Sequence, residues 1–201
     1  MKRILAIGRE FGSGGRELGR RVAEKLGIAY YDREIIAEIA KRTSMSENYI
    51  RQIVEHKPIT MFPIHVGRSF ALPIVSPVWE QGQAIFQEQH SIIREMAQKS
   101  DCVIVGRCAD YILRELHPLR VFVYADMESK IARCRANGED ADKMTDKELK
   151  QHILDVNKNR AKYYEFYTGQ EWGDRLNYDI CVNTSGADIE KLAAAISGLL
   201  E

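Results

Sequence analysis

The sequence predicts an α/β fold, in which a mainly parallel sheet lies between two layers of helices. Short apolar runs alternate along the chain with longer segments of helical periodicity. Such alternation is typical of βαβ units, whose strands are buried on both faces. The chain has 201 residues and 45% of them are apolar, enough for one domain with a substantial core. We therefore expect a single three-layer domain over residues 1–201.

Five apolar runs are expected to form the strands, because each is short and bounded by glycine or polar residues. They are the runs ILAIG, IAYYD, CVIVG, RVFVYA and YDICVNT, which begin at residues 4, 28, 102, 120 and 178. Helices are expected where apolar residues recur three or four positions apart and a small or polar residue marks an end. The expected helices cover residues 15–26, 33–43, 44–56, 79–98, 107–116, 127–138, 145–164 and 187–200.

Residues 57–78 differ from the rest of the chain, because they combine four prolines and one glycine with many apolar side chains. This composition is too apolar for a solvated linker and too interrupted for a regular element. Two interpretations stay open. The segment is either a loop packed on the domain or a mobile flap that closes over a ligand.

The charge and cysteine content restrict the classes of function. The 29 basic residues balance the 29 acidic ones, so we expect neither a nucleic-acid partner nor a membrane partner, and any anion site must be local. The four cysteines are scattered without a CxxC pair and are expected to be reduced thiols. The chain shows no signal peptide and no membrane-spanning run, which favours a cytoplasmic protein. No feature predicts an oligomeric state.

The stretch GREFGSGGRELGRR, residues 8–21, follows the first expected strand and resembles a phosphate-binding loop. Glycines allow backbone N–H groups to turn toward an anion, and the next helix presents its positive end. The strict motif G-x-x-x-x-G-K-[ST] nevertheless fails. Anchored on Gly14, it has Arg9 at the first glycine, Gly15 at the lysine and Arg16 at the hydroxyl position.

Other residues in this stretch could replace the lysine and the hydroxyl that the strict motif requires. Arg16 or Arg20 could provide the positive charge through a planar guanidinium, and Ser13 could contact Mg²⁺. Two alternatives remain. The stretch could be a simple turn, or a dinucleotide loop that begins with Gly12-x-Gly14 but has Glu17 in place of the third glycine.

Further candidate residues lie at later strand ends and on later helices. Arg107 ends the CVIVG strand, at the edge of the sheet where ligands of α/β proteins bind. Arginines near residues 133–160 are either solvated or part of a lid that brings charge onto a transferred phosphoryl group. Asp32 could orient a ribose, a base or a metal, or it could cap the following helix.

With these motifs in view, the chain resembles the cytidylate kinase-like family of P-loop proteins. The resemblance rests on AIGREFGSGGRELGRRVAEKLG, YYDREII, VIVGRCADYIL with RVFVYAD, and NKNRAKYYEFYTG. It implies a P-loop NTPase-like fold with a helical acceptor-binding insert at about residues 33–98 and a lid at about residues 133–160. It also implies phosphoryl transfer from ATP, with Mg²⁺, to a nucleoside monophosphate.

The resemblance assigns roles to individual positions. The residues expected to contact ATP are Gly12, Ser13, Gly14, Gly15, Arg16, Glu17, Asn183 and Thr184. Asp32 and Arg107 are expected to bind the acceptor, and the expected catalytic residues are Arg16, Arg133, Arg135 and Arg160. The sequence departs from the family pattern at the missing lysine and at Cys108, where an aspartate is expected.

Three hypotheses follow from these observations. The first is an ATP-dependent kinase that acts on a nucleoside monophosphate or a similar small phosphate acceptor. The second is a nucleotide-binding regulator of the same fold that transfers nothing, which the missing lysine favours. The third is an NAD-type binding protein, which would bind its ligand without Mg²⁺.

Overall fold

The structure is a computed structural model that describes residues 2–55, 77–137 and 141–201. Residues 57–76 lie outside the described residues, so neither interpretation of that segment is tested. The helix expected at residues 79–98 is α4, Pro77–Lys99.

In the described part of the chain, five parallel strands form one sheet in the order β2-β3-β1-β4-β5. The strands are β1 Ile4–Arg9, β2 Ala29–Tyr31, β3 Cys102–Val105, β4 Leu119–Tyr124 and β5 Ile180–Asn183. The central strand β1 pairs with β3 on one side and β4 on the other, with Ile7 opposite Val105 and Arg9 opposite Val123. The chain turns that follow β1, β3 and β4 therefore meet at one edge of the sheet.

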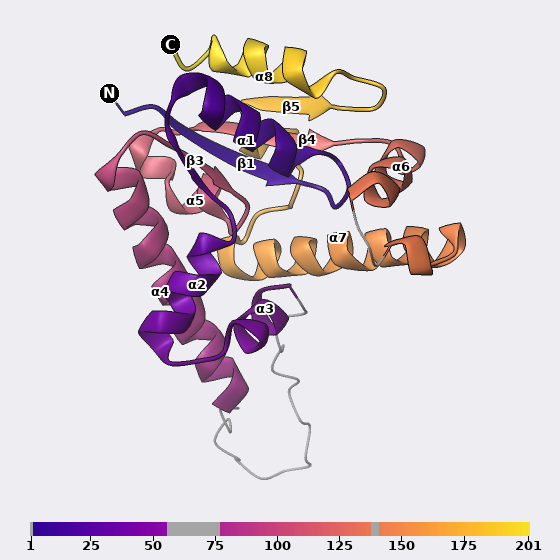
Figure 1. Cartoon of the computed structure of the whole chain (residues 1–201). Helices are drawn as coiled ribbons and strands as arrows, with labels where there is room; N and C mark the ends of the chain where they lie inside the picture. The colour runs from indigo at the N-terminus through magenta and orange to yellow at the C-terminus, as the bar shows by residue number, and fades with distance from the viewer. Residues whose placement is uncertain (1, 56–76, 138–140) are drawn as a thin grey trace.

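Helices cover both faces of this sheet (Figure 1). Helices α1 Gly15–Leu26 and α8 Ile189–Ser197 pack side by side on one face. The other face carries α2 Glu34–Thr43, α3 Glu47–Glu55, α4, α5 Ala109–Ile112 and α7 Asp146–Thr168. Helix α6 Met127–Asn137 follows β4 and contacts α7. The three-layer α/β fold is confirmed.

The core consists of two apolar clusters that the alternation of strand side chains separates. In β1, Leu5 and Ile7 pack with α1 and α8, whereas Ile4 and Ala6 pack with α2, α4 and α5. All four side chains are almost fully buried. The packed core thus fixes the positions of the residues at the carboxyl ends of the strands, where the candidate site lies.

The part expected to be a lid has an apolar cluster of its own. Leu149 and Ile153 of α7 are buried against Ile131 and Cys134 of α6 and against Phe11 of the glycine stretch. Helix α7 begins with a capping box between Thr145 and Glu148. Because Phe11 belongs to this cluster, the start of α7 is coupled directly to the loop after β1.

Two expected elements differ from the structure. The helix expected at residues 107–116 begins only at Ala109, because Gly106, Arg107 and Cys108 have φ angles of 75°, 59° and 55°, and it is divided into α5 and a short 3₁₀ helix at Arg114–Leu116. Left-handed backbone cannot continue a right-handed helix. Helix α7 extends beyond residue 164 to Thr168 and ends at Gly169, whose φ is 69°. None of the described helices could cross a lipid bilayer.

Candidate functional site

The loop between β1 and α1 presents backbone N–H groups at the edge of the sheet. Gly12 and Gly14 have φ angles of 75° and 81°, which favour glycine. A Cβ atom at Gly12 would lie 3.0 Å from the backbone oxygen of Lys130 and 3.1 Å from Cys134 Sγ, so the loop packs tightly on α6. No side chain caps the start of α1 at Gly14. The first N–H groups of this helix are thus suited to bind an anion.

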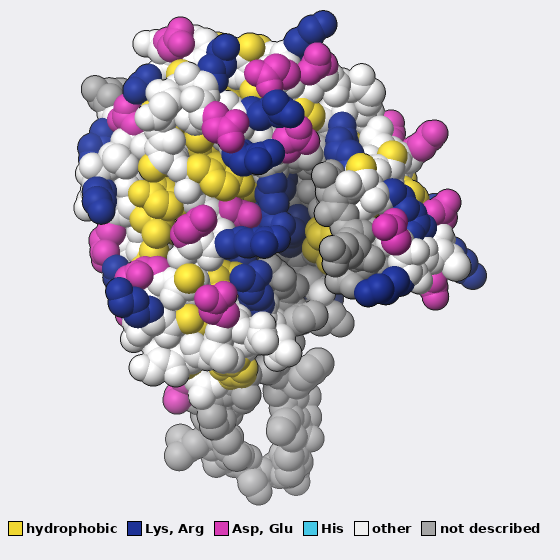
Figure 2. All heavy atoms as spheres, viewed as in Figure 1, with side chains coloured by type: hydrophobic (Ala, Val, Ile, Leu, Met, Phe, Trp, Pro, Cys, Tyr) yellow, Lys and Arg dark blue, Asp and Glu magenta, His cyan; other side chains and the backbone are white. Residues whose placement is uncertain are grey.

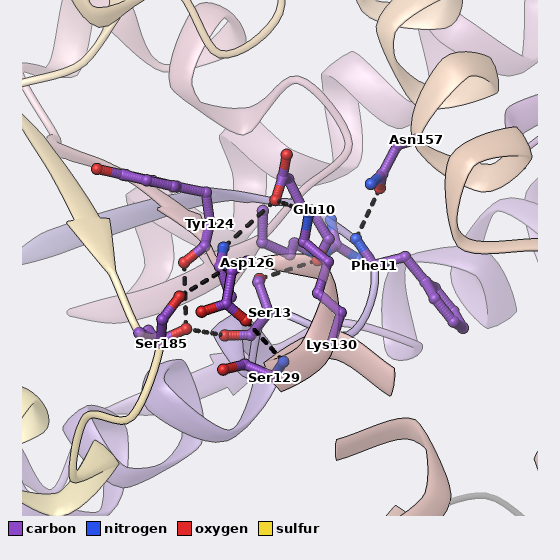
Figure 3. A network of polar contacts seen from close by, with 12 residues as sticks. Glu10, Phe11, Ser13, Tyr124, Asp126, Ser129, Lys130, Asn157 and Ser185 are labelled. Atoms are coloured by element: carbon purple, nitrogen blue, oxygen red, sulfur yellow. Dashed lines mark hydrogen bonds and ion pairs between the residues drawn. The ribbon is translucent and has the colours of Figure 1, made fainter. Parts of the chain in front are cut away.

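Hydrogen bonds from distant elements hold this loop in place. The buried Ser13 hydroxyl donates to the backbone oxygen of Glu10 over 2.9 Å. The Thr184 hydroxyl, after β5, donates to the backbone oxygen of Ser13 over 2.7 Å. The amide of Phe11 donates to Asn157 Oδ1 of α7 over 2.7 Å, and Glu10 forms an ion pair with Lys130 of α6 (Figure 3). The loop is therefore fixed before any ligand binds.

A cleft of about 620 Å³ lies over the loop. Five arginines line it, and they come from β1, α1, α6 and α7: Arg9, Arg16, Arg20, Arg133 and Arg160. The space-filling view shows Lys and Arg side chains gathered along a groove (Figure 2). Two acidic residues, Glu10 and Glu17, also line the cleft, but they pair with Lys130 and Arg21. The chain has a balanced charge overall, yet this cleft is locally positive.

A buried carboxylate lies between two of these arginines. Asp32 Oδ2 is 2.8 Å from Arg16 Nε, and Asp32 Oδ1 is 3.6 Å from Arg9 Nη2. Burial is the main cause that lowers the pKa of Arg9 to about 10, and the charge of Asp32 opposes that shift. The guanidinium of Arg9 therefore stays charged at neutral pH while being largely removed from water.

A second, smaller cavity of about 50 Å³ lies at the end of β3. Arg107 lines it together with Asp110, Tyr164 and Tyr178, and the backbone oxygen of Arg107 accepts a 2.9 Å hydrogen bond from Gln89 Nε2. Arg9 and Arg160 border both this cavity and the larger cleft. The two hollows thus share a boundary made of two arginines.

Most of the residues predicted at the site meet in the larger cleft. They are Gly12, Gly14, Gly15, Arg16, Glu17, Arg133 and Arg160. Arg107 borders the second cavity instead. Asp32 contacts the cleft through its ion pair with Arg16, and the alternative of a helix cap is not what the structure has, because Arg33 is the N-cap of α2 and no side chain caps it.

Four predicted residues use their side chains elsewhere. Arg135 is not brought to the cleft, because it donates to the backbone oxygen of Met144 and to Asp146 Oδ1 and so joins α6 to the start of α7. The hydroxyl of Ser13 donates to a backbone oxygen inside the loop, and Ser13 is not among the residues that line the cleft, so its contact with Mg²⁺ stays a prediction. Asn183 accepts hydrogen bonds from Ser185, and Thr184 supports Ser13.

Sequence reasoning did not assign a role to Arg9. A signal for it was present, because an arginine at the carboxyl end of a buried central strand is costly unless it binds something. In the sequence alone, Arg9 only marks a failure of the strict motif at its first glycine position.

The N–H groups of the loop and the arginines of the cleft are hydrogen-bond donors, which suit the phosphates of a nucleotide better than a metal ion held by the protein. The described residues contain no group of three His, Cys, Asp or Glu side chains that could hold a metal ion. Mg²⁺ in nucleotide sites is bound by the phosphates, water and few protein oxygens, so a preformed cage is not required. All four cysteines are free thiols, and Cys102 and Cys108 are buried.

This fold, with a glycine-rich turn between the central strand β1 and the uncapped start of α1, is the fold of P-loop kinases. The chain belongs to the cytidylate kinase-like family, whose model matches residues 4–186. Membership of this family supports kinase-like phosphotransfer, with use of a nucleotide, as the class of activity. The comparison with curated proteins found no match.

Several solved structures share the fold. An uncharacterized protein from Eubacterium ventriosum is 27% identical over 99% of this chain and 98% of that chain, with a TM-score of 0.72. The shikimate kinase of Bacteroides thetaiotaomicron is 16% identical over 98% of each chain, with a TM-score of 0.59. The shikimate kinase of Acinetobacter baumannii, solved with shikimate, is 17% identical over 100% of this chain and 93% of that chain, with a TM-score of 0.54.

Proposed function

We propose that the protein transfers the γ-phosphoryl group of Mg-ATP to a nucleoside monophosphate or a similar small phosphate acceptor. The observation that carries this proposal is the convergence of arginines from four elements over the uncapped start of α1. Phosphoryl transfer depends mainly on positioning and on neutralising the charge of the phosphates. A rigid loop surrounded by guanidinium groups supplies both.

On the donor side, the N–H groups around Gly12, Gly14 and Gly15 would hold the phosphates, with Arg16 and Arg20 of α1 at their outer side. Arg133 reaches the same cleft from α6, where it also donates to the backbone oxygen of Thr184. The turn at residues 183–186 is the proposed adenine side. Mg²⁺ would be held by the phosphates and would help to neutralise their charge.

On the acceptor side, Arg107 would bind the phosphate of the acceptor in the smaller cavity, with Asp32 and the region at about residues 33–98 completing that side. Arg160 borders both hollows and donates to the backbone oxygen of Arg9 over 3.2 Å. A group placed between two bound phosphates stabilises the transition state more than either ground state. No covalent intermediate with the protein is needed.

A second candidate function is a nucleotide-binding regulator of the same fold. It is favoured by Gly15, which stands where the strict motif has lysine, and by the ion pair that engages Arg16 with Asp32. This candidate predicts binding of ATP without turnover. The kinase is the better supported of the two, because Arg107 and Arg160 supply an acceptor side that a sensor of ATP does not need.

The test is Mg²⁺-dependent release of ADP from ATP across a panel of ribonucleoside and deoxyribonucleoside monophosphates. Shikimate belongs in the panel, because two proteins of the same fold are shikimate kinases. We expect a monophosphate to stimulate turnover and Arg160→Met to lower kcat at least 100-fold. Arg175→Met, at an exposed position, is the matched control and should leave kcat unchanged. ATP binding without stimulation by any acceptor would favour the regulator.

A further inference from the structure

The space that a side chain at position 15 would need is already filled by Arg9. A Cβ atom at Gly15 would lie 2.6 Å from Arg9 Cβ, closer than real Cβ atoms approach, and 3.1 Å from Arg9 Cγ, a tight contact. Position 15 is the lysine position of the strict motif, and position 9 is its first glycine position. Glycine and the basic residue have therefore changed places within the loop.

The rest of the Arg9 side chain is accommodated by a second glycine. A Cβ atom at Gly106, after β3, would fall 1.5 Å from Arg9 Nη1. The side chain thus extends from the end of β1, past the start of α1, to the end of the neighbouring strand β3. This path brings the guanidinium to the boundary between the larger cleft and the smaller cavity.

The guanidinium of Arg9 is largely buried and forms few polar contacts. Its side chain is 10% exposed, and its ion pair within the described residues is the 3.6 Å contact with Asp32 Oδ1. That distance is too long for a hydrogen bond, and the other oxygen of Asp32 binds Arg16. Holding a cation mostly out of water with no hydrogen bond to the described residues is costly, and a bound phosphate would supply acceptors for its N–H groups.

Arg16 is the less suitable replacement for the lysine. Its side chain is 43% exposed, and its Nε is 2.8 Å from the carboxylate of Asp32. Contact with a phosphate would have to compete with that ion pair and with water. Arg9 would keep its position and gain acceptors.

We propose that Arg9 makes the phosphate contact of the missing lysine, so that it binds the β- and γ-phosphates of the donor nucleotide. The inference rests on the proposed function, because it takes a nucleoside triphosphate as the ligand. It also explains why positions 15 and 106 are glycine, since either side chain would displace Arg9. The contact adds charge-assisted hydrogen bonds to those of the loop N–H groups.

The experiment measures the dissociation constants of Mg-ATP and of AMP by calorimetry for the whole chain and its variants. Arg9→Met keeps an unbranched side chain of similar length without charge, and Arg16→Met is its matched control. We expect Arg9→Met to weaken Mg-ATP binding at least tenfold, more than Arg16→Met does, and to change AMP binding by less than threefold. A purely structural role would weaken both nucleotides alike.

A reciprocal exchange provides an independent test. Gly15→Lys alone should weaken Mg-ATP binding, because the new side chain collides with Arg9, and Arg9→Gly alone should weaken it by loss of charge. The double variant R9G/G15K should bind within about threefold of the original chain, because it restores the usual arrangement. Unchanged Mg-ATP affinity in Arg9→Met, or a double variant no tighter than Arg9→Gly, would overturn the inference.

The outcomes separate this inference from the proposed function. Binding that depends on Arg9, without transfer to any acceptor, would refute the kinase and support the role of Arg9. Transfer that proceeds with unchanged Mg-ATP affinity in Arg9→Met would support the kinase and refute the role of Arg9. A chain that binds no Mg-ATP at all would refute both.

Discussion

Arg16 Nε lies 2.8 Å from Asp32 Oδ2, and this ion pair joins the start of α1 to the turn after β2. The other oxygen of the same carboxylate faces Arg9 at 3.6 Å. One buried carboxylate therefore offsets part of the charge of two arginines at the edge of the sheet. A phosphate that enters the cleft would compete with Asp32 for Arg16, whereas the longer contact with Arg9 leaves that guanidinium able to bind a second anion.

Replacing the Asp32 carboxylate leaves the neighbouring guanidinium groups of Arg9 and Arg16 without their counter-charge. We expect Asp32→Asn to lower the free energy of unfolding by about 2 kcal/mol, less than a fully buried pair would lose because Arg16 is partly exposed. Sulfate should restore more stability to this variant than to the original chain, because an anion that binds the folded state stabilises it.

Urea denaturation with and without sulfate measures both effects. Asp101→Asn, which breaks a partly exposed pair with Arg3 far from the cleft, is the control and should show a smaller loss and no special response to sulfate. Equal stability of Asp32→Asn and the original chain would contradict the charge balance described above.

The contact between Thr184 and Ser13 predicts that the loop depends on a residue far away in sequence. Thr184→Val keeps the shape of the side chain but leaves the buried oxygen of Ser13 without its donor. We expect a loss of about 1–3 kcal/mol in unfolding free energy and weaker Mg-ATP binding. Thermal unfolding and calorimetry test this, with Thr43→Val as a control whose hydroxyl bonds only to its own helix. Unaltered nucleotide affinity in Thr184→Val would show that the loop does not need this contact.

Phe11 couples the glycine loop to the lid region. Its ring packs edge-on to His152 at 5.3 Å and lies near the guanidinium of Arg160 at 5.6 Å. We expect Phe11→Ala to speed hydrogen exchange in α6 and in the first half of α7, while exchange in β1 and β3 stays slow. Exchange that is faster everywhere would instead indicate a general loss of stability.

The sequence could predict the parts of this structure that depend on local pattern. The strands, the start of α1 at Gly15 and its end before Gly27 follow from apolar periodicity and glycine position. Arg133 and Arg135 were both expected at the site, but residues two apart point to different sides of a helix, and only Arg133 faces the cleft.

Other features depend on which strands are neighbours, and the sequence alone does not determine that order. Arg9 reaches Gly106 because β3 lies directly beside β1. Thr184 reaches Ser13 because the turns after β5 and β1 meet at one edge of the sheet, although the two residues are 171 positions apart in the chain. Only these long-range contacts show which residues support the loop, such as Thr184, and which residues face the cleft.

Burial of Asp110 makes stability depend on pH. Burial raises the pKa of this carboxyl above its ordinary value of 3.8, and the hydrogen bond from Tyr164 opposes the shift only in part. The folded protein therefore keeps a proton that the unfolded chain loses, so the free energy of unfolding falls as pH rises above 3.8 toward the folded pKa. Asp110→Asn should remove this fall.

The measurement compares the original chain with Asp110→Asn by urea denaturation from pH 4 to pH 7.5. We expect the variant to gain relative stability as pH rises through that range. A difference between the two proteins that does not vary with pH would show that Asp110 titrates normally.

The central claim is that this cleft transfers the γ-phosphoryl group of ATP to a phosphate-bearing acceptor. Phosphorus NMR of the protein with Mg-ATP and one nucleoside monophosphate at a time tests it most directly. The account predicts that the γ-phosphate resonance declines only when the right acceptor is present, while the signals of ADP and of a phosphorylated acceptor grow. ATP that stays intact with every acceptor, or that yields only inorganic phosphate, would contradict it.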